Sequence, residues 1–200
     1  MIALTERNRE AAGMEKKKLA IFDLDGTLFD TVPANFAAYE SILGKHGFSL
    51  EFEHYAKNCN GRYFMDFLPE LVGPDEELAV QIHEEKIAAY PQFYHKIREN
   101  RGLFGLLEAL RRDYHIALVS TAARKSVYDI LERFHRREVF DLILTQVEIP
   151  RQKPAPDGFQ MAMAHFGVGP EDTVVFEDSP QGIAAAKACG AQCFVVKSIE

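Results

Sequence analysis

Five short apolar segments, separated by helical stretches, constrain the fold of this chain more than any other feature. Each is a short apolar run without the 3.6-residue period of a helix. Such segments are typical of strands that are buried on both faces of a sheet. They lie at 19–22 (LAIF), 115–120 (HIALVS), 141–145 (DLILT), 172–176 (DTVVF) and 192–196 (QCFVV).

The stretches between these segments carry apolar residues at helical spacing. Two of them repeat the i, i+3, i+4, i+7 pattern of a single helix face. The two sets are Leu103, Leu106, Leu107 and Leu110, and Val127, Ile130, Leu131 and Phe134. Strands that alternate with helices predict a parallel sheet with right-handed crossovers. We therefore expect an α/β fold with a three-layer, Rossmann-like parallel sheet core.

One connection is much longer than a crossover requires. Between Asp30 and Gly102 the chain contains no convincing strand, although a crossover needs only about a dozen residues. A structureless loop of this length is uncommon, and the segment reads instead as several helices. It predicts an inserted α-helical cap domain. We expect a mobile, charged leader at 1–17, a core formed by 18–31 and 100–200, and the helical cap at 32–99.

Composition narrows the possible classes of protein. The formal net charge of −7 disfavours binding to nucleic acid, and no apolar run approaches the ~20 residues that span a bilayer. The N-terminal stretch is too highly charged for a secretory signal peptide. The three cysteines lack a metal-ligand spacing and suit a reducing compartment. We expect a cytoplasmic protein, a monomer or weak dimer, with no nucleic-acid or membrane partner.

Polar side chains follow the predicted strands, at the point where each strand ends. They are Asp23 and Asp25, Ser120 and Thr121, Glu177 and Asp178, and, after a short loop, Lys153. In an open parallel sheet, ligands bind beyond the carboxyl ends of the strands. The chain thus gathers four acids, a pair of hydroxyls and a lysine at one edge of the sheet.

Acids gathered so closely need a counter-charge if they are all to stay ionised. Carboxylates and backbone carbonyls are the ligands that Mg²⁺ prefers. Lys153 would offset more of the charge and could hold a phosphate, and the glycine of the DGT turn lets backbone N–H groups face an anion. Together these groups suit phosphoryl transfer, which depends mainly on positioning and on neutralising negative charge.

Each of these motifs has an ordinary structural explanation when it is taken singly. Turns favour aspartate, so a lone DxD at a strand end indicates little. EDSP alone predicts a helix that is capped by Ser179 or Asp178 and has Pro180 in its first turn. The order of all four motifs at successive strand ends is what favours a site.

In that order the motifs resemble those of the haloacid dehalogenase-like superfamily. FDLDGTLFD resembles its first motif, ALVST its second, KPAPD its third and FEDSPQGI its fourth. The resemblance extends from Leu19 to the C-terminus. The helical segment resembles the small cap of the β-phosphoglucomutase and phosphoglycolate phosphatase group. The resemblance implies a phosphatase that acts on a small phosphorylated metabolite.

The family pattern implies roles for the acids. Asp23 would be the nucleophile that forms an aspartyl-phosphate, and Asp25 would be the general acid and base. Mg²⁺ would bind the Asp23 carboxylate, the Asp25 backbone carbonyl and the Asp178 carboxylate, with Glu177 assisting. The acid at position 25 favours phosphate chemistry, because the dehalogenases typically lack it.

The same resemblance implies a cradle for the phosphoryl group. Ser120 and Lys153 would hold its oxygens, and backbone groups of Leu24 and Thr121 would complete the cradle. The loop QKPAP is expected to contain a cis Lys153–Pro154 bond, as family members often do.

The cap is expected to select the substrate. Arg62, in a segment that resembles the group's GRS-like cap loop, is the first candidate to meet a second anionic group of the substrate, and Lys86 is the second. Tyr63 departs from the pattern, since it replaces the usual small hydroxyl residue.

Two other functions stay open at this point. A sugar phosphomutase would share every core residue, and the mutases use a lysine comparable to Lys86. They also tend to carry a histidine where this chain has Asn35, which disfavours mutase chemistry. A non-catalytic binding module is disfavoured because neither Asp23 nor Asp25 is lost.

Overall fold

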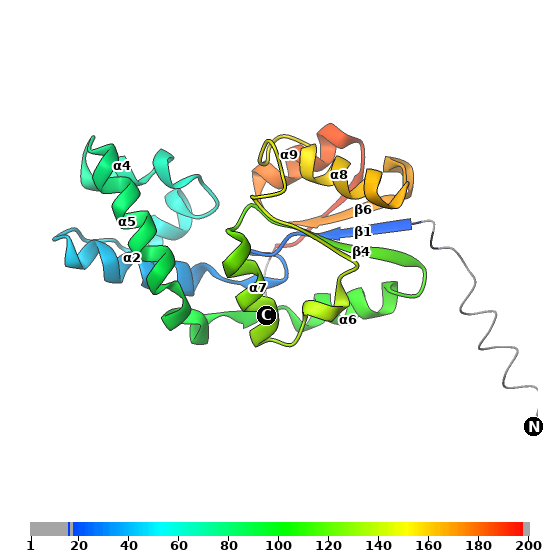
Figure 1. The fold of residues 1–200 in the computed structure, drawn as a ribbon, viewed down its shortest axis with the longest axis horizontal. Coiled ribbons are helices and arrows are strands. Elements are labelled where there is room, and N and C mark those ends of the chain that lie inside the picture. Colours follow the sequence, from blue (N-terminus) through cyan, green and yellow to red (C-terminus); the bar gives the residue numbers. More distant parts are fainter. Residues whose placement is uncertain (1–15, 17, 198–200) are drawn as a thin grey trace, which may run out of the picture.

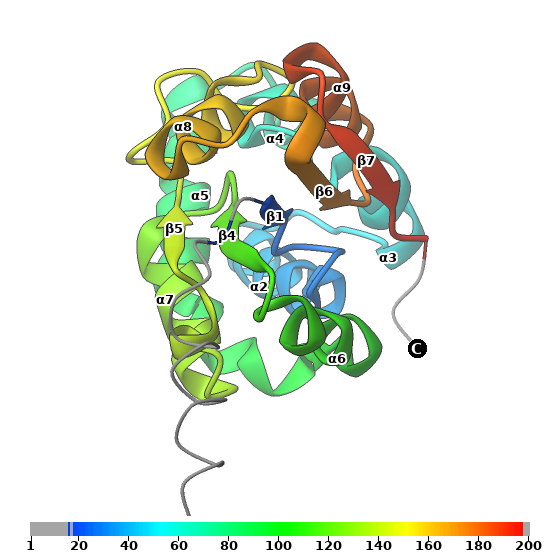
Figure 2. The same cartoon turned by 90° about the vertical axis from the view of Figure 1, so that its right-hand side faces the viewer.

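The computed structural model describes Lys16 and residues 18–197, and its core is a five-stranded parallel sheet. The strands lie in the order β5-β4-β1-β6-β7, with β1 in the centre (Figures 1 and 2). They are β1 (Lys18–Phe22), β4 (Tyr114–Val119), β5 (Leu142–Leu144), β6 (Thr173–Glu177) and β7 (Gln192–Val195). All five predicted strands are therefore present, and the predicted α/β class is confirmed.

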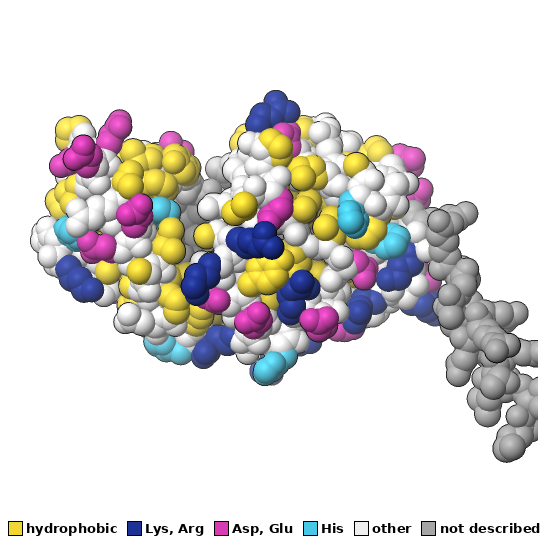
Figure 3. Space-filling view, in the orientation of Figure 1, with side chains coloured by type: hydrophobic (Ala, Val, Ile, Leu, Met, Phe, Trp, Pro, Cys, Tyr) yellow, Lys and Arg dark blue, Asp and Glu magenta, His cyan; other side chains and the backbone are white. Residues whose placement is uncertain are grey.

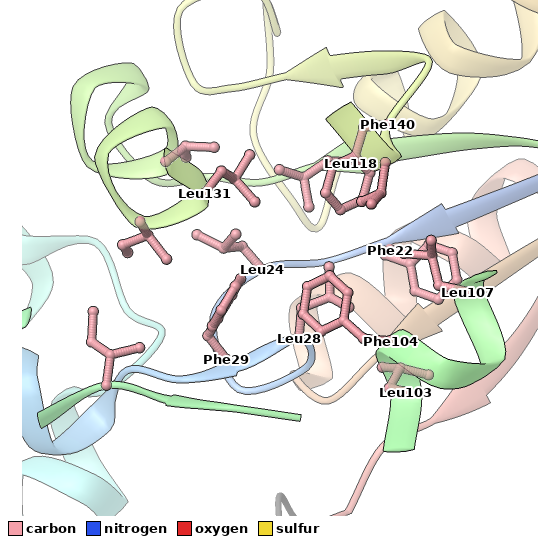
Figure 4. Close-up of a cluster of buried hydrophobic side chains, with 14 of the residues drawn as sticks. Phe22, Leu24, Leu28, Phe29, Leu103, Phe104, Leu107, Leu118, Leu131 and Phe140 are labelled. Atoms are coloured by element: carbon pink, nitrogen blue, oxygen red, sulfur yellow. The ribbon is translucent and has the colours of Figure 1, made fainter. Parts of the chain in front are cut away.

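The sheet is buried on both faces because helices cover it from two sides (Figure 1). On one side Phe22 and Leu118 pack against α6 and α7, in the cluster that Figure 4 shows. On the other side Ile21 and Val119 pack against α8 and α9. These helices are α6 (Arg101–Leu110), α7 (Arg124–Arg133), α8 (Asp157–Phe166) and α9 (Pro180–Cys189). Residues of β1 thus alternate between the two cores, which explains its continuously apolar sequence.

The predicted face of α6 is wrong in one position. Leu106, which the spacing placed against the sheet, is 43% exposed, whereas Phe104 is 1% exposed. Phe104 contacts Phe29 edge-on at 5.4 Å, so the helix turns the neighbouring stripe inward. The larger aromatic ring buries more apolar surface there than a leucine would.

A helical insertion, Val32–Lys96, separates the first strand from the rest of the sheet. Its helices surround a separate apolar cluster that includes Tyr39, Leu43, Phe67 and Ile82. Its elements are α2 (Val32–Lys45), α3 (Phe52–His54), the π-helical η1 (Tyr55–Cys59), the 3₁₀ turn η2 (Phe64–Asp66), α4 (Leu68–Val72), α5 (Glu76–Ala89) and the 3₁₀ segment η3 (Tyr90–Lys96). Short 3₁₀ turns also occur outside it at η4 (Arg137–Val139) and η5 (Pro170–Asp172).

The two ends of the helical insertion meet in a small antiparallel ladder. Here β2 (Phe29–Asp30) pairs with β3 (Arg98–Glu99), so the prediction that no strand lies between Asp30 and Gly102 is wrong for β3. Strands this short leave little periodicity to detect. Arg98 donates to Asp30 at 2.7 Å and Arg136 donates to Glu99 at 2.5 Å. Both ends are therefore fixed at one place beside the sheet.

The predicted leader, residues 1–17, lies outside the described residues except for Lys16. Within the part of the chain that is described, no helix combines the length and the apolar character needed to cross a membrane.

Candidate active site

The candidate site lies at the carboxyl ends of β1, β4 and β6, on the side of the sheet toward α2 and α5 (Figure 1). Asp23 follows β1, Ser120 follows β4, and Glu177 ends β6. Because the three strands are parallel neighbours in register, with Phe22 opposite both Leu118 and Phe176, these residues meet at one edge. In Figure 3 the surface is hollowed between the helical insertion and the sheet with its helices.

Lys153 joins three of the strand ends. Its Nζ donates to Asp23 Oδ1 at 2.6 Å, to Glu177 Oε1 at 2.6 Å and to the carbonyl of Val119 at 3.0 Å. The side chain is only 7% exposed. Charge-assisted bonds of this length fix both carboxylates in place. The predicted cis bond between Lys153 and Pro154 is present.

The charges of this group shift one another's pKa values. Burial by itself would lower the pKa of Lys153, but the adjacent Asp23 and Glu177 carboxylates outweigh it and raise that pKa above its ordinary value. Burial raises the pKa of Asp23, against the opposing effect of the Lys153 ammonium. The lysine is therefore held as a cation that compensates two acids.

Asp178 lies beside the DGT turn, which begins at Asp25. Its Oδ1 accepts a hydrogen bond from Thr27 Oγ1 at 2.9 Å, and burial raises its pKa to about 6. Gly26 has a φ of +89°, and a Cβ on it would lie 2.2 Å from Asp178 Oδ2. Glycine is therefore required both for the turn and for the close approach of the carboxylate.

Glu177 is completely buried and held at both oxygens. Oε1 accepts from Lys153, and Oε2 accepts from the backbone N–H of Ser179 at 2.9 Å and from its Oγ at 3.0 Å. Ser179 also caps α9 by accepting from the Gly182 N–H at 3.0 Å, as predicted. A Cβ on Gly182 would lie 1.8 Å from Glu177 Oε1, so only glycine admits this carboxylate.

Three of the acids are close enough to share a cation. Oxygens of Asp23, Glu177 and Asp178 all lie within 4.8 Å of one another. An all-oxygen, all-carboxylate set suits a hard divalent ion such as Mg²⁺. The residues present therefore fit the predicted metal, and its main expected carboxylate ligands, Asp23 and Asp178, belong to the cluster.

Asp25 points toward the connection to the helical insertion. Its Oδ1 accepts a hydrogen bond from Thr31 Oγ1, and burial raises its pKa. Neither Thr31 nor Thr27 was predicted from the sequence to bind these acids. Both are hydroxyl residues that follow Asp25 within one short segment, and that proximity was the signal that could have indicated the contact.

The two hydroxyls after β4 have different environments. Ser120 is 1% exposed, and its Oγ accepts from the Ala122 N–H at 3.1 Å. Thr121 is exposed. Of the two side chains, only that of Ser120 is therefore buried at the edge of the sheet, and phosphate binding by either residue stays a prediction.

Lys86 reaches the same region from the helical insertion. It is 8% exposed, and its Nζ donates to Asn35 Oδ1 at 2.6 Å. The Nζ lies 4.2 Å from the centre of the Tyr90 ring and 5.0 Å from that of Tyr39. Burial lowers its pKa to about 8, while the charge of Asp25 acts in the opposite direction. The available signal in the sequence was the helical spacing of Lys86 from Ala79, Ile82 and Ala89, which are buried with it on one face of α5.

Arg62 is occupied within the helical insertion. Its guanidinium donates to the carbonyls of Asn58 and Asp66 and to Glu70 Oε1 at 2.9 Å. Contact of Arg62 with a substrate stays a prediction, and it would require these bonds to be exchanged. Tyr63 beside it is 62% exposed.

Comparisons with known proteins agree with this geometry. Residues 20–196 match a family model described as haloacid dehalogenase-like hydrolase. A phosphorylated carbohydrates phosphatase of Thermotoga maritima is 28% identical over 85% of this chain and 80% of its own length. Phosphoglycolate phosphatase 1 of Pseudomonas aeruginosa is 28% identical over 88% of this chain and 68% of its own length. CbbY of Rhodobacter sphaeroides, solved in complex with phosphate, has a TM-score of 0.77 and is 26% identical, covering 89% of this chain and 85% of that one.

Proposed function

The chain belongs to the haloacid dehalogenase-like hydrolase family, and from that premise we propose that it is a Mg²⁺-dependent phosphatase. It hydrolyses the phosphate monoester of a small metabolite through an aspartyl-phosphate intermediate. The observation that carries the proposal is the arrangement of Lys153, which holds Asp23 and Glu177 at 2.6 Å beside Asp178. This arrangement supports the assignment of Asp23 as the nucleophile, of the acids as a cation-binding set and of the Lys153 ammonium as a phosphate-binding group.

The proposed reaction has two displacements at phosphorus. A carboxylate oxygen of Asp23 attacks the phosphorus, the ester bond breaks, and the leaving oxygen takes a proton from Asp25. Asp25 then accepts a proton from water as that water attacks the aspartyl-phosphate, which releases phosphate and restores Asp23. The raised pKa of Asp25 suits a residue that must carry a proton in the first step.

The residues that would hold Mg²⁺ are Asp23, Asp178 and the backbone carbonyl of Asp25, with Glu177 assisting. When bound, the ion offsets the charge of the acids and polarises a phosphoryl oxygen. Ser120, Lys153 and the backbone of Leu24 and Thr121 hold the phosphoryl oxygens.

We propose that the helical insertion acts as the cap that selects the substrate. Lys86 is the better placed of the two predicted contacts, because it is buried close enough to Asp25 for the charge of that carboxylate to act on it. Arg62 would contribute only after leaving Glu70. The activities for which two relatives are named, those of a phosphorylated carbohydrates phosphatase and a phosphoglycolate phosphatase, support a small phosphorylated substrate. Cytoplasmic location and a monomeric or weakly dimeric state belong to the same proposal.

A sugar phosphomutase is the second candidate. The observation in its favour is the buried Lys86, since the mutases use a comparable lysine. Asn35 is the observation against it, since an amide replaces the imidazole expected there and binds Lys86 directly. A mutase would interconvert sugar phosphates when primed with a bisphosphate and would release little free phosphate.

The test is release of phosphate from p-nitrophenyl phosphate with Mg²⁺ and, in parallel, with EDTA. We expect Mg²⁺-dependent release by the wild type and a loss of at least about 10³-fold in Asp23→Asn. Asp113→Asn is the matched control, because Asp113 is an exposed aspartate that pairs with Arg112. Wild-type protein that releases no more phosphate than Asp23→Asn would overturn the proposal. If the wild type is active, a panel of phosphorylated metabolites then identifies its substrate.

A further inference from the structure

Tyr90 carries a buried hydroxyl that the proposed chemistry does not use. It begins η3, one helical turn after Lys86, and is 3% exposed. Its hydroxyl is buried, and no group of the described residues meets hydrogen-bond geometry with it, although the nearby Asn35 side chain acts to lower its pKa. The signal in the sequence was the i, i+4 spacing from Lys86, which places both residues on one helix face.

An unpaired buried hydroxyl is unfavourable, because it loses its hydrogen bonds to water without replacement. Phenylalanine would fill the same space without that cost. Two neighbouring tyrosines show the usual arrangement, since Tyr39 shares a hydrogen bond with His83 Nδ1 at 2.8 Å and Tyr94 donates to Asp129 at 3.3 Å. Tyr90 therefore differs from these two neighbouring tyrosines, whose hydroxyls are hydrogen-bonded to protein side chains.

The surroundings of Tyr90 place it with the polar groups that face Asp25. Lys86 Nζ lies over its ring at 4.2 Å and binds Asn35 at 2.6 Å. Asn35 Nδ2 in turn donates to the carbonyl of Thr31 at 3.3 Å, and Thr31 binds Asp25. After burial, the charge of Asp25 is the next largest influence that raises the pKa of Tyr90. The other side of the ring meets Tyr94 edge-on at 5.0 Å.

We propose that Tyr90 is a specificity-determining residue whose hydroxyl donates a hydrogen bond to an oxygen of the leaving group. The inference rests on the proposed function, in which Asp25 protonates that leaving group. A leaving group held between Asp25 and the Lys86–Tyr90 pair meets a phenol and an ammonium, both of which donate. The site then favours phosphate esters that carry a hydroxyl on the carbons next to the ester.

The test compares two esters of the same carbon skeleton, glycerol 3-phosphate and propyl phosphate. The ratio of their kcat/KM values is measured in the wild type, in Tyr90→Phe and in Tyr94→Phe. We expect the wild type to prefer glycerol 3-phosphate and Tyr90→Phe to lower that preference about five- to tenfold, the effect of one hydrogen bond. Tyr94→Phe is the matched control and should keep the wild-type ratio, because its hydroxyl already binds Asp129.

Thermal unfolding gives an independent readout. Tyr90→Phe should keep or raise Tm without substrate, because it removes an unpaired hydroxyl, whereas Tyr94→Phe should lower it slightly. An unchanged ratio in Tyr90→Phe, no preference in the wild type, or a fall in Tm would overturn the role of Tyr90. Mg²⁺-dependent cleavage of p-nitrophenyl phosphate would still stand in those cases, so failure of this inference is distinguishable from failure of the phosphatase proposal.

Discussion

Two buried lysines have different partners: Lys153, in the loop between β5 and α8, and Lys86, in α5 of the helical insertion. Lys153 touches two carboxylates at 2.6 Å, and they raise its pKa. Lys86 touches a neutral amide and two aromatic rings, and burial lowers its pKa to about 8. The two side chains are almost equally buried, so the difference comes from their partners.

The two lysines differ in whether the protein itself compensates their charge. At the sheet edge, Asp23 and Glu177 compensate the positive charge of Lys153, so the three side chains stabilise one another in the folded protein. In the helical insertion no carboxylate of the described residues binds the Lys86 ammonium directly, so its buried charge must be offset by the stability of the rest of the fold. We infer that an anionic or oxygen-rich ligand is what completes the environment of Lys86. Substitutions at the two lysines should therefore have opposite effects on stability.

The largest effect is expected for Lys153→Met. It removes the shared counter-charge and leaves Asp23 and Glu177 buried together, so the free energy of unfolding should fall by about 3 kcal/mol at pH 7. Activity should fall about 10³-fold, because the phosphoryl oxygens lose a donor as well. Urea unfolding in EDTA and phosphate release with Mg²⁺ measure the two effects.

Lys125→Met is the matched control for this substitution. Lys125 is 73% exposed and pairs with Asp129 within one helix, so little change is expected in either measurement. If Lys153→Met keeps the wild-type stability, Lys153 does not stabilise the buried Asp23 and Glu177 carboxylates. The proposed difference between the two lysines would then be wrong.

A smaller effect of the opposite sign is expected for Lys86→Met. The pKa of about 8, below the ordinary value, means that the folded state binds the proton less well than the unfolded state. Removing the charge should raise the free energy of unfolding by about 1 kcal/mol at pH 7, after allowance for the bond that Asn35 loses. The kcat/KM for the natural substrate should fall about tenfold or more, because a charged donor is lost.

The stability gain and the activity loss are measured by urea unfolding and by steady-state kinetics on the same preparations. Lys86→Met that is less stable than the wild type at pH 7 would mean that the ammonium is compensated in the folded protein. Lys86 would then resemble Lys153, and the ligand-binding interpretation would lose its basis.

The smallest effect concerns pH. Below about pH 8 Lys86 is protonated in both states and the penalty of its buried charge is complete. As pH rises from there toward the ordinary lysine pKa, the folded protein loses this proton first and the penalty disappears. The stability advantage of Lys86→Met over the wild type should therefore shrink above pH 8 and change sign by about pH 10, because the penalty disappears while the lost bond to Asn35 remains.

Parallel urea titrations of the two proteins between pH 7 and pH 10 check this prediction. Taking the difference between them cancels the contributions of tyrosines and other groups that titrate in both. A difference that is constant with pH would place the lysine pKa outside this window.

The residues at the sheet edge could be predicted from the sequence because each of them directly follows, or ends, a strand that the sequence reveals. Parallel strands end at one edge, so Asp23, Ser120 and Glu177 had to meet there once the strands were identified. The cap of α9 by Ser179 likewise follows from residues that adjoin each other in the sequence, whereas the cis bond at Pro154 was expected from the family resemblance.

What the sequence did not reveal depends on packing between distant segments. Leu106 and Phe104 both lie in an apolar helix, and only the shape of the neighbouring core decides which one turns inward. Lys86 shares the buried face of α5 with Ala79 and Ile82, but its contacts with the rings of Tyr39 and Tyr90 form only once the helical insertion has folded. A partner such as Glu70 for Arg62 is equally invisible until the chain has folded.

The central place of β1 has a consequence for the order in which the chain can fold during synthesis. Leu19 of β1 pairs with His115 of β4 on one side and with Thr173 of β6 on the other. During synthesis β1 therefore cannot pair until β4 and β6, which are made much later, have left the ribosome. The cluster of the helical insertion, from Tyr39 to Ala89, is complete before either partner exists. The helical insertion can therefore form its own apolar cluster before the sheet is assembled. In this order the helical insertion, for which we propose substrate selection, precedes the sheet edge, for which we propose the chemistry.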